Sequence, residues 1–291
     1  MSMISNPPQS IRRLTTSLAL TAMWFVATAS VHAQIELEMS TVGDRFVVGE
    51  PVYASIKISN NAGKPIRVGN FPGWMDIAIE NKSGGLTTRT SSLAATQGVI
   101  VESGKSTDIP IEITELYKLD KRSRYQAKAT LRVPGWDQAF SSKEIFFDLV
   151  EGNKLWSQKY SSPMLRTAEG GQRVYSYNLI ASQGSDGRRL IVQIKDTTYE
   201  RIVRSVPVCK MVSFSKPEAR IDQVSNLHLL CQYGQSYFTY NIYSPVGELL
   251  LRMTYQSAPA RPTLETDAEG LIIVQGGLRI PMDTDYLPKS N

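Results

Sequence analysis

Cysteine and histidine are scarce in this sequence of 291 residues, which contains only two of each. Two cysteines are too few for a zinc ribbon, and two histidines leave little material for a metal site or for imidazole catalysis. Beyond residue 33 no apolar run is long enough to span a membrane as a helix. These shortages exclude a polytopic membrane protein and a histidine-rich metal centre, and they predict that the protein carries no cofactor.

The first 33 residues have the pattern of a secretory signal peptide. The segment before residue 14 contains no acid and ends in two arginines, and residues 14–30 are uncharged and mainly apolar. Residues 31–33, Val-His-Ala, place small side chains at the positions that signal peptidase reads, which predicts cleavage before Gln34. The open alternative is a retained membrane anchor, because the apolar run approaches the length that spans a bilayer. We therefore expect a bacterial periplasmic or secreted protein without a membrane span after cleavage.

Signal-peptide cleavage lowers the net charge, and export changes the expected state of the cysteines. Removal of the two leader arginines lowers the net charge from +5 to +3. A surplus this small does not indicate a nucleic-acid partner, and the basic cluster at residues 118–128 is interrupted by Asp120, which favours a solvated face. Disulfides persist outside the cytoplasm, so Cys209 and Cys231 are predicted to form a structural disulfide. Two buried free thiols are the alternative.

Residues 34–152 predict a β-sandwich. Short segments of alternating apolar and polar residues follow one another without a helical period, separated by turns rich in Asn, Gly, Pro and Asp. Residues 47–51 (Val-Val-Gly-Glu-Pro), residues 60–66 (Asn-Asn-Ala-Gly-Lys-Pro-Ile) and Tyr125 resemble the immunoglobulin-like or fibronectin-III-like domains of exported bacterial proteins. The cysteine pair of antibody domains is absent. The resemblance implies an immunoglobulin-like fold and a role as a binding module or spacer.

Residues 153–280 show a second β pattern with longer strands and tight hairpins, and residues 281–291 are predicted to be a C-terminal tail. One hairpin turns at residues 184–187 (Gly-Ser-Asp-Gly) and another at residues 245–247 (Pro-Val-Gly). Residues 216–234 realign with residues 261–277 at an offset of 44 or 45 positions. This period is typical of a four-stranded propeller blade.

The number of blades raises a difficulty. At 45 residues each this half of the chain supplies about three blades, whereas closed propellers need about four to eight. Open blades leave exposed strand edges, so we expect the repeat module either to pack an edge on the first domain or to self-associate. An ordinary antiparallel meander whose two segments match by chance is the alternative.

No catalytic site emerges from the motifs. His228 and Cys231 point to opposite faces of a strand, which disfavours a dyad. Residues 98–106 superficially match a phosphate-binding loop, but five residues separate the two glycines and a strand follows in place of a helix. The acidic residues at 267–269 and 283–285 lack the spacing of a calcium loop.

Trp74 and Trp136 are the candidate ligand contacts. Each follows a Pro-Gly turn directly, and a tryptophan at a loop tip can stack on a sugar ring or anchor a protein partner. The alternative is that Trp74 lies in the core and Trp136 caps it. We therefore expect an exported, non-enzymatic binding or scaffolding protein that acts through protein–protein or surface-glycan contacts. The alternative function is a periplasmic or secreted hydrolase with dispersed carboxylates.

Overall fold

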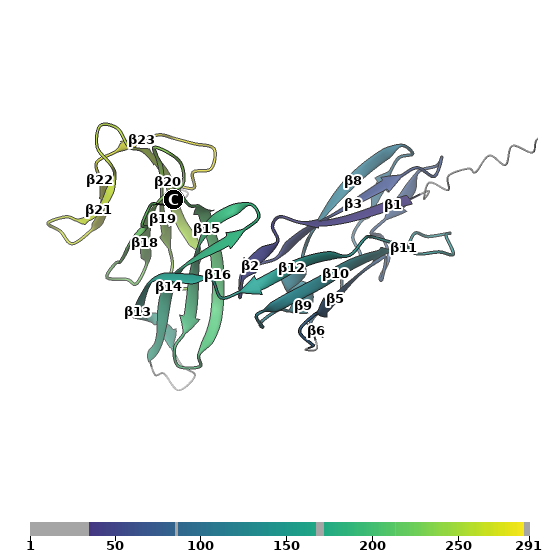
Figure 1. Ribbon diagram of the computed structural model, residues 1–291, viewed down its shortest axis with the longest axis horizontal. Coiled ribbons are helices and arrows are strands. Elements are labelled where there is room, and N and C mark those ends of the chain that lie inside the picture. The colour runs from purple at the N-terminus through teal and green to yellow at the C-terminus, as the bar shows by residue number, and fades with distance from the viewer. Residues whose placement is uncertain (1–34, 85–86, 167–171, 213, 288–291) are drawn as a thin grey trace, which may run out of the picture. The chain divides into compact units, whose positions relative to one another are not determined.

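The computed structural model describes residues 35–84, 87–166, 172–212 and 214–287. The predicted signal peptide, residues 1–33, and its cleavage position before Gln34 lie outside the described residues. The fold is all-β, with 2% helix and 57% strand, as the sequence predicts. Its largest sheets contain three to five strands (Figure 1). The arrangement of the sheets is β-propeller-like.

The strands before residue 152 form two larger sheets. The three-stranded sheet has the order β1-β3-β8, and the five-stranded sheet has the order β11-β10-β12-β2 with β5 paired to β10. The bounds are β1 (Ile35–Thr41), β2 (Arg45–Val47), β3 (Tyr53–Asn60), β5 (Met75–Asn81), β8 (Lys105–Glu112), β10 (Ser123–Leu131), β11 (Phe140–Ser141) and β12 (Ile145–Val150). Two small pairs complete this part: β4 (Ile66–Val68) with β7 (Val99–Val101), and β6 (Thr88–Arg89) with β9 (Tyr117–Lys118).

These two sheets share one apolar core because their strands alternate between buried and exposed residues. Leu37 and Ile56 from the three-stranded sheet belong to the same buried cluster as Ile77, Ala127 and Leu149 from the five-stranded sheet. This arrangement does not settle the immunoglobulin-like assignment, which stays a prediction.

One short helix interrupts the strand pattern, although the sequence shows no helical period. It is α1 (Ile113–Leu116), and it joins β8 to β9. Ile113 and Leu116 are buried, so this turn contributes two side chains, at positions i and i+3, to the core. A single helical turn is too short to produce a periodic signal.

The strands after residue 152 form meanders in which sequence neighbours are also neighbours in the sheet. The order is β13-β14-β15-β16 in one sheet and β17-β18-β19-β20-β23 in the next, and β21 pairs with β22. The bounds are β13 (Asn153–Arg166), β14 (Gln172–Gly184), β15 (Gly187–Asp196), β16 (Arg201–Lys210), β17 (Glu218–Ile221), β18 (Leu227–Gln232), β19 (Tyr237–Tyr243), β20 (Leu249–Gln256), β21 (Thr263–Thr266), β22 (Ile272–Gln275) and β23 (Leu278–Arg279).

The predicted hairpins are confirmed, and the predicted repeat corresponds to a pair of hairpins. Gly184 pairs with Gly187 at the first turn, and β19 pairs with β20 across the second. The two repeat segments coincide with two hairpins, β17–β18 and β21–β22. Residues predicted as a tail contact a sheet, because Tyr286 forms a β-bridge with Arg252 of β20.

The two cysteines are paired as predicted. Cys209 of β16 and Cys231 of β18 lie at disulfide distance, so the bond joins two sheets. Among the described residues, no helix is long and apolar enough to cross a membrane.

Candidate functional site

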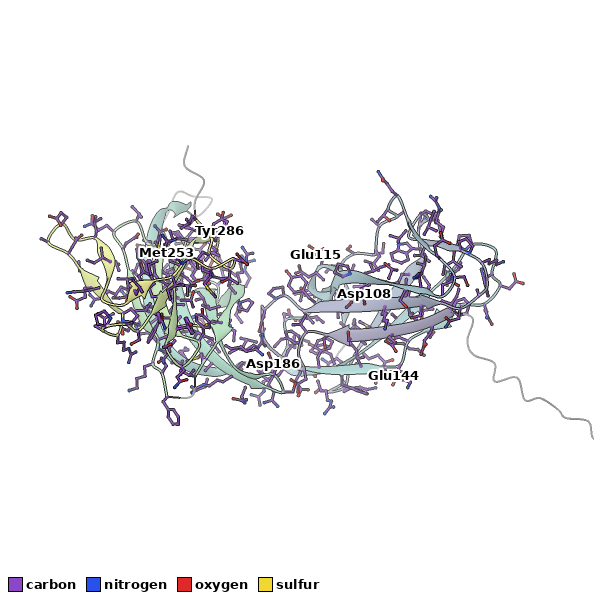
Figure 2. The ribbon with its side chains drawn as sticks, turned by 90° about the horizontal axis from the view of Figure 1, so that it is seen from above. Asp108, Glu115, Glu144, Asp186, Met253 and Tyr286 are labelled. Atoms are coloured by element: carbon purple, nitrogen blue, oxygen red, sulfur yellow. A yellow bond between two sulfur atoms is a disulfide. The ribbon has the colours of Figure 1, made fainter. Side chains whose placement is uncertain are left out.

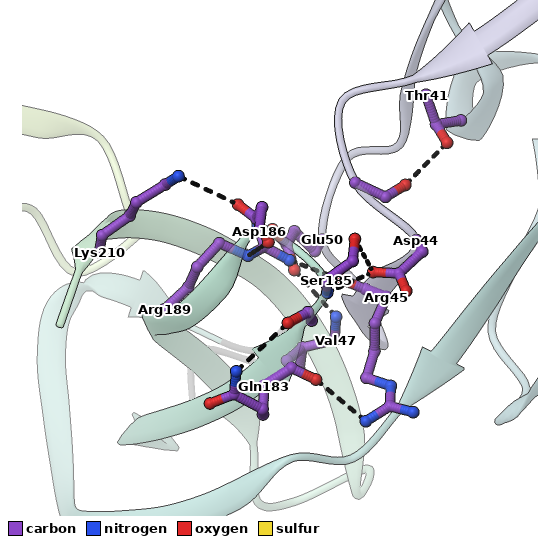
Figure 3. Close-up of polar contacts among 12 residues, drawn as sticks. Thr41, Asp44, Arg45, Val47, Glu50, Gln183, Ser185, Asp186, Arg189 and Lys210 are labelled. Carbon is purple, nitrogen blue, oxygen red and sulfur yellow. Dashed lines mark hydrogen bonds and ion pairs between the residues drawn. The ribbon is translucent and has the colours of Figure 1, made fainter. Parts of the chain in front are cut away.

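A buried ion pair joins the segment before β3 to the hairpin β14–β15. Glu50 is 2% exposed, and its Oε1 accepts a hydrogen bond from Arg189 Nη1 over 2.7 Å. Its Oε2 accepts from the backbone N–H of Val47 over 2.8 Å, so both carboxylate oxygens are occupied (Figure 3). Burial raises the pKa of Glu50, and the hydrogen bond from Val47 and the charge of Arg189 oppose this shift. We call this ion pair, together with the contacts of residues 44–50 with β14, β15 and β16, the Glu50 joint.

Hydrogen bonds to backbone carbonyls extend the Glu50 joint along residues 45–49. Ser205 donates its Oγ hydrogen to Val48 O over 2.8 Å and its N–H to Gly49 O over 3.0 Å. Arg189 Nη2 donates to Arg45 O over 2.6 Å. A β-carbon on Gly49 would lie 2.6 Å from Ile202 Cγ2, and the φ of Gly49 is +85°, so glycine is required against the side chain of Ile202.

The hairpin turn at residues 184–187 adds an exposed contact to the same joint. Asp44 Oδ1 accepts from the N–H of Ser185 over 2.8 Å and from its hydroxyl over 2.9 Å (Figure 3). These two donors lower the pKa of Asp44. Lys210 lies 3.8 Å from Asp186 in the same turn. The turn thus has a second role besides reversing the chain.

An apolar contact lies behind the polar ones. Val47, Ile180 and Ile191 are buried together in a cluster separate from the larger cores. A β-carbon on Gly152 would lie 2.4 Å from Ile180 Cγ2, so this position also requires glycine. Because buried apolar and buried polar contacts coincide here, the Glu50 joint holds residues 44–50 in one position against β14, β15 and β16.

A cleft of about 360 Å³ opens beside the Glu50 joint. We call it the joint cleft. Its lining combines aromatic, acidic and basic side chains: Tyr53, Glu112, Tyr117, Lys118, Asp120 and Arg204, with Glu50 and Gly49 at the joint. Tyr53 and Glu112 face each other across β3 and β8. Tyr53 is 47% exposed, and its pKa is raised first by burial and then by the negative charge of Glu112.

The joint cleft offers binding groups more readily than catalytic ones. The carboxylate of Glu50 is used in the joint, and Asp120 forms an ion pair with Lys118 at 3.2 Å. Glu112 Oε1 accepts from the hydroxyl of Thr114 over 2.8 Å. Tyr53 and Arg204 are both exposed in the cleft, as are Lys118 and Asp120. Within the described ranges, no group of three or more His, Cys, Asp or Glu residues could hold a metal ion.

The two candidate tryptophans have different environments. Trp74 is 4% exposed, and its indole N–H donates to Ala94 O over 3.2 Å. Trp136 is half-buried against the first core, and it contacts Phe140 edge to face at 5.6 Å, with Lys64 5.3 Å from the centre of its ring. Their role in ligand contact stays a prediction, and Trp136 is the one with ring surface left to contact a ligand.

His228 belongs to a buried chain of polar groups that the sequence does not reveal. Its Nδ1 lies 2.6 Å from Tyr240 Oη, and its Nε2 lies 3.2 Å from Asp222 Oδ2. Burial lowers the pKa of His228, against the opposing effect of Asp222. The order Asp–His–hydroxyl is that of a catalytic triad, but Tyr240 is 6% exposed and His228 7%. The chain of contacts therefore stabilises the sheet.

Exposed carboxylates are scattered over the surface. Asp108, Glu115 and Glu144 come from β8, α1 and the residues before β12, and they lie at separate points of the molecule (Figure 2). None of the three lines the joint cleft. These three residues therefore cannot supply the carboxylate pair that glycoside hydrolysis requires to a ligand in the joint cleft.

Comparison with known proteins assigns no family to the chain. No protein-family model matches it, and no curated protein sequence does so either.

Proposed function

We propose that the protein is an exported, non-enzymatic binding protein, periplasmic or secreted, that holds a surface glycan in the joint cleft. The disulfide between Cys209 and Cys231 supports an oxidising compartment. The observation that carries the proposal is the composition of the cleft, in which an exposed tyrosine face lies beside a carboxylate and a guanidinium.

Sugars suit this combination of groups. The apolar face of a sugar ring stacks on an aromatic side chain, and its hydroxyls donate to carboxylates and accept from guanidinium groups. A cleft that contains Glu112 and Asp120 as well as Lys118 and Arg204 has no strong preference for anions. A neutral, polyhydroxylated ligand therefore fits better than a phosphate or a nucleic acid.

The rigid support of the cleft also favours binding. Glu50 and Gly49 line the cleft and belong to the Glu50 joint, whose contacts hold one wall in place. A preorganised wall lowers the entropic cost of ordering side chains around a ligand. The Glu50 joint thus has a purpose beyond stability in this proposal.

A glycan array probed with the purified protein tests the proposal. We expect binding of a neutral oligosaccharide that falls at least tenfold in Tyr53→Ala and in Arg204→Ala. Tyr286→Ala is the matched control, because Tyr286 is similarly exposed at 51% and does not line the cleft. Binding that survives both cleft substitutions, or no glycan bound at all, would contradict the proposal. Weakened binding in Trp136→Ala alone would move the site to Trp136.

A hydrolase is the second candidate, because Glu50, Glu112 and Asp120 line the same cleft. The raised pKa of Glu50 is the kind of shift that a general acid needs. The hydrogen bonds to both of its oxygens and its 2% exposure argue against contact with a substrate. Release of reducing sugar from an array ligand, abolished by Glu112→Gln, would establish the hydrolase and exclude the simple binding role.

A further inference from the structure

The two hairpins of the internal repeat have the same turn. In β17–β18 the N–H of Asp222 donates to Asn226 O over 3.0 Å, and the N–H of Asn226 donates to Asp222 Oδ1 over 2.7 Å. In β21–β22 the N–H of Asp267 donates to Leu271 O over 2.9 Å, and the N–H of Leu271 donates to Asp267 Oδ1 over 2.7 Å. Every position differs by 45, so the hairpins can be compared residue by residue.

The turns also match in backbone conformation. Ser225 has φ 70° and Gly270 has φ 82°, and the two residues are again 45 positions apart. Positive φ at a serine is uncommon, so the agreement reflects a shared turn geometry. The residue alignment is therefore fixed by structure as well as by sequence.

The hairpins differ in what pairs with their second strand. Leu227 and Leu229 of β18 pair with Tyr243 and Asn241 of β19. The equivalent residues of β22 are Ile272 and Val274, and in the described part of the chain β22 pairs only with β21. The edge of β22 that is free in the second hairpin is thus the edge that β19 covers in the first hairpin.

The hydrogen bond of the turn determines which backbone groups lie on that edge. Since Asp267 donates to Leu271 O, alternation along the ladder directs the N–H and C=O groups of Leu271 and Ile273 toward β21. The N–H and C=O groups of Ile272 and Val274 then point away from β21. These are the groups that Leu227 and Leu229 use to pair with β19 in the first hairpin.

The free edge of β22 lacks the features that prevent pairing. Residues 271–275 (Leu-Ile-Ile-Val-Gln) contain no charge and no proline, and the β21–β22 pairing has no register shift. Leu271 is 63% exposed and Ile273 is 41% exposed. An uncharged, regular edge with exposed apolar side chains is suited to add a strand.

We propose that β22 is a dimerisation strand that pairs antiparallel with β22 of a second copy. The edge is complementary to itself, because Ile272 and Val274 are placed symmetrically about Ile273. A two-fold axis at Ile273 lets Ile272 of each copy exchange two backbone hydrogen bonds with Val274 of the other. The two Ile273 side chains then face each other as a close non-hydrogen-bonded pair. No charged side chain opposes this pairing, and it does not depend on the proposed glycan site.

Engineered disulfides test both the dimer and its register. The chain has no cysteine other than the bonded pair, so an added cysteine can form a disulfide with the same residue of a second copy without competition from another free thiol. Two Ile273→Cys chains would have Cα atoms about 4.5 Å apart and are expected to form a covalent dimer. Two Gln275→Cys chains, in the matched control, would be about 14 Å apart and are expected to remain uncrosslinked.

Light scattering tests whether the edge drives association in the unmodified protein. We expect the native chain to have twice its monomer mass at about 100 μM and Ile273→Lys to be monomeric, because a charge would face its own copy. Val203→Lys on β16, where Val203 is 43% exposed, controls for the loss of an exposed apolar residue and is expected to stay dimeric. Circular dichroism checks that each variant is folded.

Three results would overturn the proposal. A native monomer at this concentration would exclude the dimer, even if β22 captures a strand of another protein. A dimer that crosslinks equally through Ile273→Cys and Gln275→Cys would exclude the register. A dimer abolished by Val203→Lys and unaffected by Ile273→Lys would place the interface on β16.

Discussion

The strands before and after residue 152 bury different kinds of side chain. Among the described residues, the buried polar residues of the first region are Glu50, Asn60, Ser123 and Ser142. In the second region twelve polar residues are buried, including Asn178, His228 and Asn241, and so are five tyrosines, against two in the first region. The two regions are similar in length, so the first depends mainly on apolar packing and the second adds networks of buried hydrogen bonds.

The Glu50 joint is where the two kinds of stabilisation meet. A carboxylate from the apolar region and a guanidinium from the polar region form a pair with side chains 2% and 16% exposed. A buried pair is costly to break, because the remaining charge has no partner. The joint therefore couples the two regions more strongly than its small size indicates.

The largest expected effect is that of removing Arg189. Arg189→Ala leaves Glu50 buried without its partner and should lower the free energy of unfolding by about 3–5 kcal/mol at pH 7. The pKa of Glu50, already raised, rises further, so the folded state binds its proton more tightly and the loss shrinks as the pH falls. Urea unfolding at pH 7 and pH 5 measures the loss of stability and its change with pH.

Glu50→Gln is the matched control for the joint. The amide keeps an acceptor for the N–H of Val47 and carries no charge, so its cost should be smaller than that of Arg189→Ala and nearly independent of pH. Equal losses in the two variants would contradict this explanation, and so would a loss in Arg189→Ala that does not change with pH. Either result would mean that the unpaired charge of Glu50 is not the cause of the lost stability.

The second prediction concerns the apolar region. Leu131→Ala removes a fully buried side chain from the first core and should cost about 2–5 kcal/mol through lost packing and a cavity. The same loss is expected at pH 5 and pH 7, because the titratable residues of its cluster are Tyr117 and Tyr125, and burial raises the pKa of both above the ordinary tyrosine value. A pH-dependent loss in urea unfolding would contradict the contrast between the regions.

The third prediction concerns the polar region. Tyr177→Phe removes a buried hydroxyl that lies 2.9 Å from both Ser225 O and Ser244 O. Ser225 O then loses this donor, whereas Ser244 O keeps the N–H of Gly247 over 2.9 Å, so the substitution should cost about 1–3 kcal/mol in thermal or urea unfolding. Tyr199→Phe, at a position 59% exposed, should change stability by less than about 0.5 kcal/mol. Equal effects of the two substitutions would show that the buried network contributes little.

The sequence predicts the strands well because each strand depends on neighbouring residues. The Gly-Ser-Asp-Gly turn and the alternation on either side of it are enough to place the hairpin of β14 and β15. The repeat of Asp222 and Asp267 predicts two similar hairpins because an aspartate that caps its own turn acts within a few residues.

The candidate site could not be predicted in the same way. Glu50 and Arg189 are 139 residues apart, and Glu50 stands in a Gly-Glu-Pro segment that is typical of a solvated turn. Nothing near it in sequence indicates that it is buried. Likewise, Tyr53 and Arg204 line the same cleft only because the joint holds residues 48–49 against Ser205 of β16. The glycines at positions 49 and 152 gave no signal either, because their positive φ and the lack of space for a β-carbon are visible only in the structure.

The smallest expected effect distinguishes the regions by acid sensitivity. Burial lowers the pKa of His228 in the folded protein below its ordinary value of 6.5, so the unfolded chain takes up the proton first. Stability from this group is therefore complete above pH 6.5 and falls as the pH drops below it, with a slope of at most about 1.4 kcal/mol per pH unit. The groups that face the imidazole are Asp222 and Tyr240.

His228→Gln tests this assignment because the amide can keep hydrogen bonds to both neighbours without titrating. We expect the variant to be slightly less stable than the native protein at pH 7.5 and to lose less stability between pH 6.5 and pH 5. The comparison is made by urea unfolding at several pH values, with Leu131→Ala as the reference that should follow the native slope. If His228→Gln also follows the native slope, the acid sensitivity comes from other groups, and the contrast between the regions would then rest on Tyr177 and its neighbours.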